Sequence, residues 1–171
     1  MPKKQIKVRG GRKSFVTVDL DMTVADHRRR LKKACVGGVI DRDVLFSASL
    51  ILEDKVIAGA AAALMQIRKH HSIVFLSART RRVSGVTKKW LQRHKLFKPG
   101  DRLMVVDSEA EKLKCVKRLL PELYAIIDDF KYDYQSGRPR LSNYLLPELL
   151  NLNAPVIVFD RNWRHIMRTY F

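Results

Sequence analysis

Residues 14–23 read SFVTVDLDMT, a short apolar run that leads into two carboxylates spaced two positions apart. The run is rich in β-branched and aromatic residues, which is typical of a buried strand. The polar residues after it predict that the strand runs directly into a loop. Asp19 and Asp21 therefore stand where this strand is expected to end.

Four more apolar runs have the length and composition of strands, and helix-forming stretches separate most of them. Strands that alternate with helices, each strand continuously apolar, predict an α/β fold with a parallel sheet and helices on both of its faces. The expected strands are residues 72–76 (SIVFL), 102–106 (RLMVV), 123–127 (LYAII) and 155–159 (PVIVF), and the expected helices are residues 55–69, 83–94, 108–120 and 142–150.

Polar side chains follow three of the expected strands. Asp19 and Asp21 follow the first, Ser77 follows the second, and Asp128 and Asp129 follow the fourth. In open parallel sheets, ligands bind beyond the carboxyl ends of the strands, so these side chains are expected to share one site. A serine hydroxyl there could bind a phosphate oxygen, and the aspartates could hold a hard cation such as Mg²⁺.

The expected helix at residues 108–120 offers two lysines to this site. Ser108 is a predicted N-cap with Glu111 as its capping-box partner. A lysine on this helix could neutralise charge shared by a nucleophile and a phosphate. Lys112 has apolar residues three, four, seven and eight positions later, whereas Lys114 directly follows an apolar residue. Both lysines remain candidates.

The charge of the chain is strongly positive and unevenly placed. Lys and Arg number 34 against 17 acids, a formal net charge of +17. Residues 55–100 contain no Asp or Glu, and residues 28–33 form a basic cluster close after the first strand. Such a charge favours capture of polyanions, so it suggests nucleic-acid binding through a basic surface. A merely solvated basic surface is the alternative.

The domain organisation is expected to be simple. Residues 1–13 form a basic, flexible lead-in, and residues 14–171 form a single domain with a small helical cap at about residues 26–54. No apolar run approaches the roughly 20 residues of a membrane helix, so no membrane partner is expected. Two cysteines are too few for a disulfide framework, which favours a cytoplasmic setting.

Four of these features together resemble the haloacid dehalogenase superfamily. The run FVTVDLDMT resembles its signature of four hydrophobic residues followed by DxDxT, and IVFLS is similar to its second motif. A helix-borne lysine followed by IIDD resembles the third and fourth motifs. The resemblance implies a Rossmann-like sheet and a Mg²⁺-dependent phosphatase that works through an aspartyl-phosphate intermediate.

The resemblance also implies a role for each residue. Asp19 would attack phosphorus, and Asp21 would protonate the leaving oxygen and then activate water, which a neighbouring carboxylate would favour by raising its pKa. Mg²⁺ would be held by the Asp19 carboxylate, the Asp21 backbone carbonyl and Asp128. Asp129 would be a further ligand or lie just behind them. Thr23, the last residue of the signature, would contact the substrate.

Two local segments refine the expected substrate. The stretch SARTRRVSGVTKKWLQRHKL is similar to a segment of phage-type polynucleotide kinase phosphatases, and VIVFDRNWRH resembles a segment of the 5′(3′)-deoxyribonucleotidases. They imply a phosphorylated nucleotide or nucleic-acid end as substrate, with Arg79 as a phosphate or substrate contact. Two alternatives are a nucleic-acid-binding protein with weak activity on the same scaffold, and a phosphatase of small metabolites.

Overall fold

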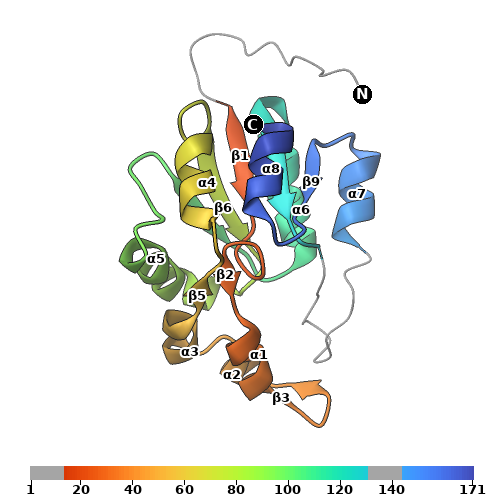
Figure 1. The fold of residues 1–171 in the computed structure, drawn as a ribbon. Helices are drawn as coiled ribbons and strands as arrows, with labels where there is room; N and C mark the ends of the chain where they lie inside the picture. The colour runs from red at the N-terminus through yellow and green to blue at the C-terminus, as the bar shows by residue number, and fades with distance from the viewer. Residues whose placement is uncertain (1–13, 131–143) are drawn as a thin grey trace.

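The computed structural model describes residues 14–130 and 144–171, and a five-stranded sheet lies at its centre (Figure 1). The strands lie in the order β7-β6-β1-β8-β9, and every neighbouring pair is parallel. The predicted α/β fold is therefore confirmed. The expected lead-in at residues 1–13 lies outside the described residues. The strands are β1 (Phe15–Val18), β6 (Ser72–Ser77), β7 (Arg102–Val105), β8 (Leu123–Asp128) and β9 (Val156–Val158).

Helices cover both faces of this sheet. Successive residues of a strand point to opposite faces, so each strand places apolar side chains under the helices on both sides. Val16 and Val18 of β1 pack on one face, in the core cluster that includes residues of α4, α5 and α8. Phe15 packs on the other face, in the cluster with residues of α6 and α7. The helices are α4 (Ala60–Ile67), α5 (Ser84–Arg93), α6 (Glu109–Leu119), α7 (Leu145–Asn151) and α8 (Trp163–Tyr170).

The register of the sheet aligns the ends of its three central strands. Val18, the last residue of β1, pairs with Phe75 of β6 and Ile127 of β8. The Asp19 N–H then donates to the carbonyl of Ile127 at 2.9 Å, which extends the ladder by one bond. The residues that follow β1 and end β6 and β8 therefore lie along the same edge of the sheet.

A small helical insert joins β1 to α4 and lies beyond the carboxyl ends of the strands (Figure 1). The small helical cap expected at about residues 26–54 falls within this insert, and its role as a cap stays a prediction. Its two antiparallel strand pairs were not predicted, because two-residue strands are too short to show a hydrophobic period. Its elements are β2 (Ala25–Asp26), α1 (Arg28–Ala34), β3 (Cys35–Val36), β4 (Val39–Ile40), α2 (Arg42–Leu45), α3 (Ala48–Glu53) and β5 (Lys55–Val56).

Two helices differ from the sequence-based expectation. The expected helix at residues 55–69 is shorter, because Lys55 and Val56 pair with β2 and the helix begins only after Gly59. Gly59 has φ +85°, and a Cβ there would lie 3.2 Å from Cβ of Trp163. Helix α8 was not predicted, although Asn162 caps it by accepting a hydrogen bond from the His165 N–H at 3.1 Å.

Within the described ranges, no helix has both the length and the apolar character that crossing a membrane requires. Both cysteines are free thiols. The expected α6 helix is confirmed together with its N-cap, since the Glu111 N–H donates to the Ser108 hydroxyl at 3.2 Å. The Glu111 carboxylate differs from the predicted capping box, because it accepts from the Asp107 N–H at 2.9 Å. The Ser108 N-cap fixes the start of α6, the helix that carries Lys112.

Candidate active site

Lys112 lies at the centre of the candidate site. Its Nζ donates to Asp19 Oδ1 and to Asp128 Oδ2, each at 2.6 Å, and all three side chains are buried. Lys112 reaches them from the first turns of α6, on the side of the helix that packs on the sheet through Cys115 and Val116. The structure thus brings Lys112 into the site and leaves Lys114 exposed.

Three carboxylates lie close together beside this lysine. Carboxylate oxygens of Asp19, Asp128 and Asp129 all lie within 4.8 Å of one another. Burial raises the pKa of Asp19 well above its ordinary value, and Asp128 and Asp129 add to this effect against the lowering influence of Lys112. Burial opposes the charge on Lys112, but Asp128 and Asp19 outweigh it and raise the pKa of Lys112. The negative charges of the three carboxylates therefore act on one another at close range.

The donor atoms of this cluster suit a hard divalent cation. Three clustered carboxylates offer oxygen ligands, which Mg²⁺ and Ca²⁺ prefer over nitrogen or sulfur. A cation among them would also offset the repulsion between these carboxylates. The Phe130 N–H donates to Asp128 Oδ1 at 2.9 Å, which holds that carboxylate in place. The residues present therefore fit the expected Mg²⁺ site.

Asp21 lies in a different environment, between two arginines. Arg79 donates to it through Nη2 at 2.5 Å and Nε at 3.0 Å, and Arg30 donates through Nη2 at 2.5 Å. Burial acts to raise the pKa of Asp21, but the charges of Arg30 and Arg79 outweigh it and hold that pKa well below its usual range. The pKa shift is thus opposite to the upward shift that sequence reasoning expected.

The two arginines also join Asp21 to the insert through Asp54. Arg30 Nη2 and Nε donate to Asp54 at 3.0 and 3.3 Å, and Arg79 Nη2 lies 3.5 Å from Asp54. The remaining nitrogen of Arg30 donates to the carbonyl of Leu45 at 2.9 Å, and Trp90 donates to the carbonyl of Asp54. We call Asp21, Arg30, Asp54 and Arg79 the arginine cluster.

The sequence contained no signal for Arg30 and Asp54 as members of this cluster. Arg30 is one of three consecutive arginines in a region without a recognisable motif, and Asp54 follows a short helix. Burial raises the pKa of Asp54 to about 6 in spite of Arg30 and Arg79. Burial also lowers the pKa of His27 to about 4, although its Nδ1 lies 3.6 Å from Asp21.

The loop after β6 holds Arg79 in this cluster. Thr80 has φ +101°, an unfavourable backbone conformation for a β-branched residue. Its hydroxyl donates to Asp107 Oδ1 at 2.8 Å, and the Arg81 N–H donates to the same oxygen at 2.9 Å. Arg79 itself is fully buried, and its Nη1 has no hydrogen-bond partner within the described part of the chain. Among the described residues, Arg79 forms hydrogen bonds and ion pairs with Asp21 and Asp54.

Ser77 and Thr23 are both buried, in different positions relative to Asp19. Ser77 is the last residue of β6, the strand next to β1, so it lies at the same edge of the sheet. Thr23 is fully buried, and its carbonyl accepts a hydrogen bond from Trp163 Nε1 at 3.0 Å. The Thr23 hydroxyl has no hydrogen-bond partner among the described residues. Thr23 therefore packs beneath α8 rather than facing solvent.

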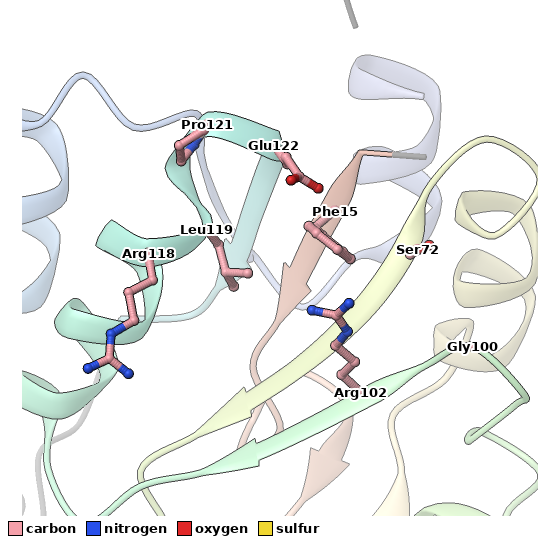
Figure 2. A pocket seen from close by; sticks show the side chains of 8 residues that line it. All are labelled: Phe15, Ser72, Gly100, Arg102, Arg118, Leu119, Pro121 and Glu122. Atoms are coloured by element: carbon pink, nitrogen blue, oxygen red, sulfur yellow. The ribbon is translucent and has the colours of Figure 1, made fainter. Parts of the chain in front are cut away.

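A cavity of about 550 Å³ lies at the opposite end of the sheet (Figure 2). It is bordered by the first residues of three strands, Phe15, Ser72 and Arg102, and the Arg102 guanidinium lies 4.7 Å from the centre of the Phe15 ring. Since Asp19 and Asp128 lie at the carboxyl ends of β1 and β8, this cavity is separate from the candidate site.

Two solved structures are similar to this chain. A haloacid dehalogenase-like family hydrolase from Streptococcus pneumoniae has a TM-score of 0.59 and 12% identity, and the match covers 93% of this chain and 99% of that one. A Thermotoga maritima protein assigned as a beta-phosphoglucomutase has a TM-score of 0.54 and 15% identity, over 92% of this chain and 100% of that one. No protein-family model matches the sequence, and no curated protein matches it at a significant level.

These similarities show that the chain has the haloacid dehalogenase-like fold, as its motifs predicted. Because the sequence identities are so low, these similarities establish the fold alone, and the chemistry must be argued from the site. The finer resemblance to polynucleotide kinase phosphatases and deoxyribonucleotidases stays a prediction.

Proposed function

We propose that this protein is a Mg²⁺-dependent phosphomonoesterase that uses Asp19 as its nucleophile. One observation carries the proposal: Lys112 Nζ bridges Asp19 and Asp128 at 2.6 Å on each side, at the carboxyl ends of two adjacent strands. The arrangement gives a carboxylate a fixed position and a cationic neighbour, and places it among oxygen ligands for a metal. Positioning and electrostatic stabilisation supply most of the catalysis in phosphoryl transfer.

The reaction proceeds in two displacements. In the first, an oxygen of Asp19 forms a bond to phosphorus, the phosphoester P–O bond breaks, and the leaving oxygen takes up a proton. In the second, water attacks the same phosphorus, loses a proton, and releases inorganic phosphate with the Asp19 carboxylate restored. Lys112 stays beside Asp19 in both steps and offsets the negative charge that the phosphate brings.

Asp21 would exchange these protons, and Arg79 would control when it can do so. As a carboxylate held by two arginines, Asp21 is a weak base, so accepting a proton from water in the second displacement requires that an arginine leave it. Donating a proton in the first displacement has the same requirement. A phosphate group offers Arg79 an alternative anion, which gives a role to the expected contact between Arg79 and substrate.

Mg²⁺ would be held by the carboxylates of Asp19, Asp128 and Asp129 and by the backbone carbonyl of Asp21. When bound, it would neutralise the phosphate oxygens and thereby favour attack by an anionic nucleophile. Ser77, at the end of the neighbouring strand, would bind a phosphate oxygen through its hydroxyl. We also propose that residues 14–171 work as one domain, with the insert as its small cap.

For the substrate, we propose a nucleotide or a phosphorylated nucleic-acid end. The formal net charge of +17 supports this choice, because a strongly basic surface concentrates polyanions around a site. The second candidate function is a nucleic-acid-binding protein with weak activity. The intact Asp19, Lys112 and Asp128 geometry favours an active enzyme over this alternative.

A panel of substrates tests the proposal. Wild-type protein and Asp19→Asn are compared with Mg²⁺ on mononucleotides, 3′- and 5′-phosphorylated oligonucleotides, sugar phosphates and p-nitrophenyl phosphate. Asp19→Asn should lose about four orders of magnitude in kcat, because an amide cannot form the acyl phosphate. Comparable Mg²⁺-dependent hydrolysis by a folded Asp19→Asn protein would remove Asp19 from this role. A preference for sugar phosphates would favour a small-metabolite phosphatase.

A further inference from the structure

The basic residues of helix α1 are partly neutralised within the insert. Arg28 pairs with Asp26, while Arg29 Nη1 lies 3.1 Å and Lys33 Nζ 3.7 Å from Glu53 Oε2. Arg30 is buried in the arginine cluster. The carboxylates of Asp26 and Glu53 thus offset part of the positive charge that the sequence placed over the site.

Helix α5 and the loop after it present the opposite case. Their basic side chains are exposed, and none of them makes an ion pair with a carboxylate of the described residues. The nearest acid in the sequence, Asp101, pairs with Arg68 at 2.6 Å. We call this set the α5 face, and it consists of Lys88, Lys89, Arg93, Lys95 and Lys98.

The α5 face is connected to the candidate site. Only residues 80–83 separate Arg79 from the start of α5, and α5 packs against α3 of the insert. At the far end of the helix, a groove of about 390 Å³ runs between α5 and the insert. Arg93 and His94 border it on one side, and the insert borders it on the other with the charged residues Arg29, Glu53, Asp54 and Lys55. Ten residues of helix span about 15 Å, so the basic charge extends well away from Asp19.

The chemistry of the α5 face fits a polyanion better than a membrane. Several cations spread along a helix match a chain of phosphates, whereas a single phosphate could engage only one or two of them. A helix that lies on a membrane needs apolar side chains to insert. The exposed large apolar residues of the described chain lie elsewhere, and the apolar residues Trp90 and Leu91 of α5 are buried in the core.

We propose that the α5 face binds the sugar-phosphate backbone of a single nucleic-acid strand whose terminal phosphate enters the Asp19 site. The inference rests on the proposed function, since it assumes that the site takes a phosphate ester. It assigns substrate capture to α5 and not to the arginines of α1. The unpaired charge of the α5 face favours the strand because each contact releases counterions from its phosphates.

Two charge-matched variants test this assignment in the full-length Asp19→Asn protein, which cannot turn over. One carries Lys88→Gln, Lys89→Gln and Arg93→Gln, and the other carries Arg28→Gln, Arg29→Gln and Lys33→Gln. Each removes three positive charges from exposed helix positions. Binding of a fluorescent single-stranded oligonucleotide with a terminal phosphate is measured by anisotropy over a range of salt concentrations.

The α5 variant should bind at least about tenfold more weakly, and its slope of log K against log salt should fall by about 2, at roughly 0.7 per lost phosphate contact. The α1 variant should lose less than about threefold. Equal losses in the two variants would overturn the assignment, because net charge alone would then explain binding. Vesicles of anionic phospholipid serve as a competitor. If they displace the labelled oligonucleotide as strongly as unlabelled oligonucleotide does, the assignment would be overturned in favour of a membrane surface.

The same variants in the active protein separate this inference from the proposed function. For the α5 variant, the ratio of kcat/KM on the phosphorylated oligonucleotide to that on p-nitrophenyl phosphate should fall about tenfold. An unchanged ratio with intact hydrolysis of p-nitrophenyl phosphate would overturn the inference and leave the phosphatase standing. Binding that depends on the α5 face without any hydrolysis would overturn the phosphatase and support the binding surface.

Discussion

Asp19 and Asp21 are two residues apart in the sequence and lie in opposite electrostatic environments. Asp19 shares one lysine with Asp128 and lies close to Asp129, and burial together with these carboxylates raises its pKa. Asp21 has two arginines close to it, and its pKa is lowered. The chain turns directly after Asp21: Met22 has φ +62° and its N–H donates to the carbonyl of Ala25, so the chain leaves the sheet and enters the insert.

This difference shows how one short motif can serve two purposes. Asp19 lies beside two other carboxylates, which suits a residue that would help to hold a metal. Asp21 is held by two arginines that it shares with Asp54, which suits a residue that would stay in place until an anion displaces its partners. The core of the sheet supplies the first environment, and the insert supplies much of the second.

The largest expected effect comes from making the same substitution at both positions. Asp21→Asn should lower the free energy of unfolding by about 3 kcal/mol, because it leaves two buried arginines with one carboxylate between them. Asp19→Asn should leave that free energy unchanged or higher in metal-free buffer, because it removes one of three repelling carboxylates. Urea unfolding monitored by circular dichroism measures both.

Asp43→Asn is the control for this pair, since Asp43 is largely exposed and pairs with Arg82 at the surface. Its effect should stay below about 1 kcal/mol. Destabilisation of similar size by Asp19→Asn and Asp21→Asn would show that the two environments do not differ as described.

Removing and restoring the metal should produce the next largest effect. EDTA should inactivate the protein and Mg²⁺ should restore it, while Ca²⁺ should substitute poorly because its coordination is larger and looser. Mg²⁺ at about 100 times its Kd should raise the free energy of unfolding by about 2.7 kcal/mol. The Asp128→Asn variant should lose most of this increase. The Glu122→Gln variant should keep it, because it changes an exposed carboxylate at the other end of the sheet. Full activity in excess EDTA would refute the metal site.

A smaller effect should connect the insert to the Asp21 environment. Arg30→Met, Asp54→Asn and the double variant form a cycle that isolates the interaction between these two side chains. Because Arg30 donates to Asp54 at 3.0 and 3.3 Å in a buried position, the coupling should be about 1–2 kcal/mol. Additive losses in urea unfolding would mean that the pair does not hold the insert in place.

The smallest effect is expected at Lys114. Because Lys114 is exposed, Lys114→Gln should change both the free energy of unfolding and RT ln kcat by less than about 0.5 kcal/mol. Lys112→Gln is its counterpart and should abolish most of the turnover, because Asp19 and Asp128 would lose their shared cation. A large loss of turnover at Lys114 would reverse the assignment of the two lysines.

The sequence was most informative where the pattern is local. Strand composition and helix caps predicted the sheet and α6, and the apolar spacing after Lys112 correctly indicated which side of the helix is buried. The metal cluster could be expected because parallel strands bring Asp19 and Asp128 to one edge.

The arginine cluster could not be predicted in the same way. It depends on Arg30 and Asp54, which meet through the tertiary packing of an insert whose strands have only two residues each. No periodicity marks such short elements, and consecutive arginines give no indication which of them is buried. The pKa of Asp21 follows from this packing, so its direction could not be read from the DxD spacing.

The hydrogen bond between Trp163 and the carbonyl of Thr23 has a consequence for biosynthesis. Its partners are 140 positions apart, and Lys112 is 93 positions from Asp19. A chain emerging from the ribosome thus exposes Asp19 long before Lys112 arrives, and the indole that supports the loop comes later still. Domains generally fold as units, so the candidate site is complete only after these late residues have emerged. A nascent chain halted before residue 163 would carry every motif residue and lack the support that α8 gives to the loop after Asp19.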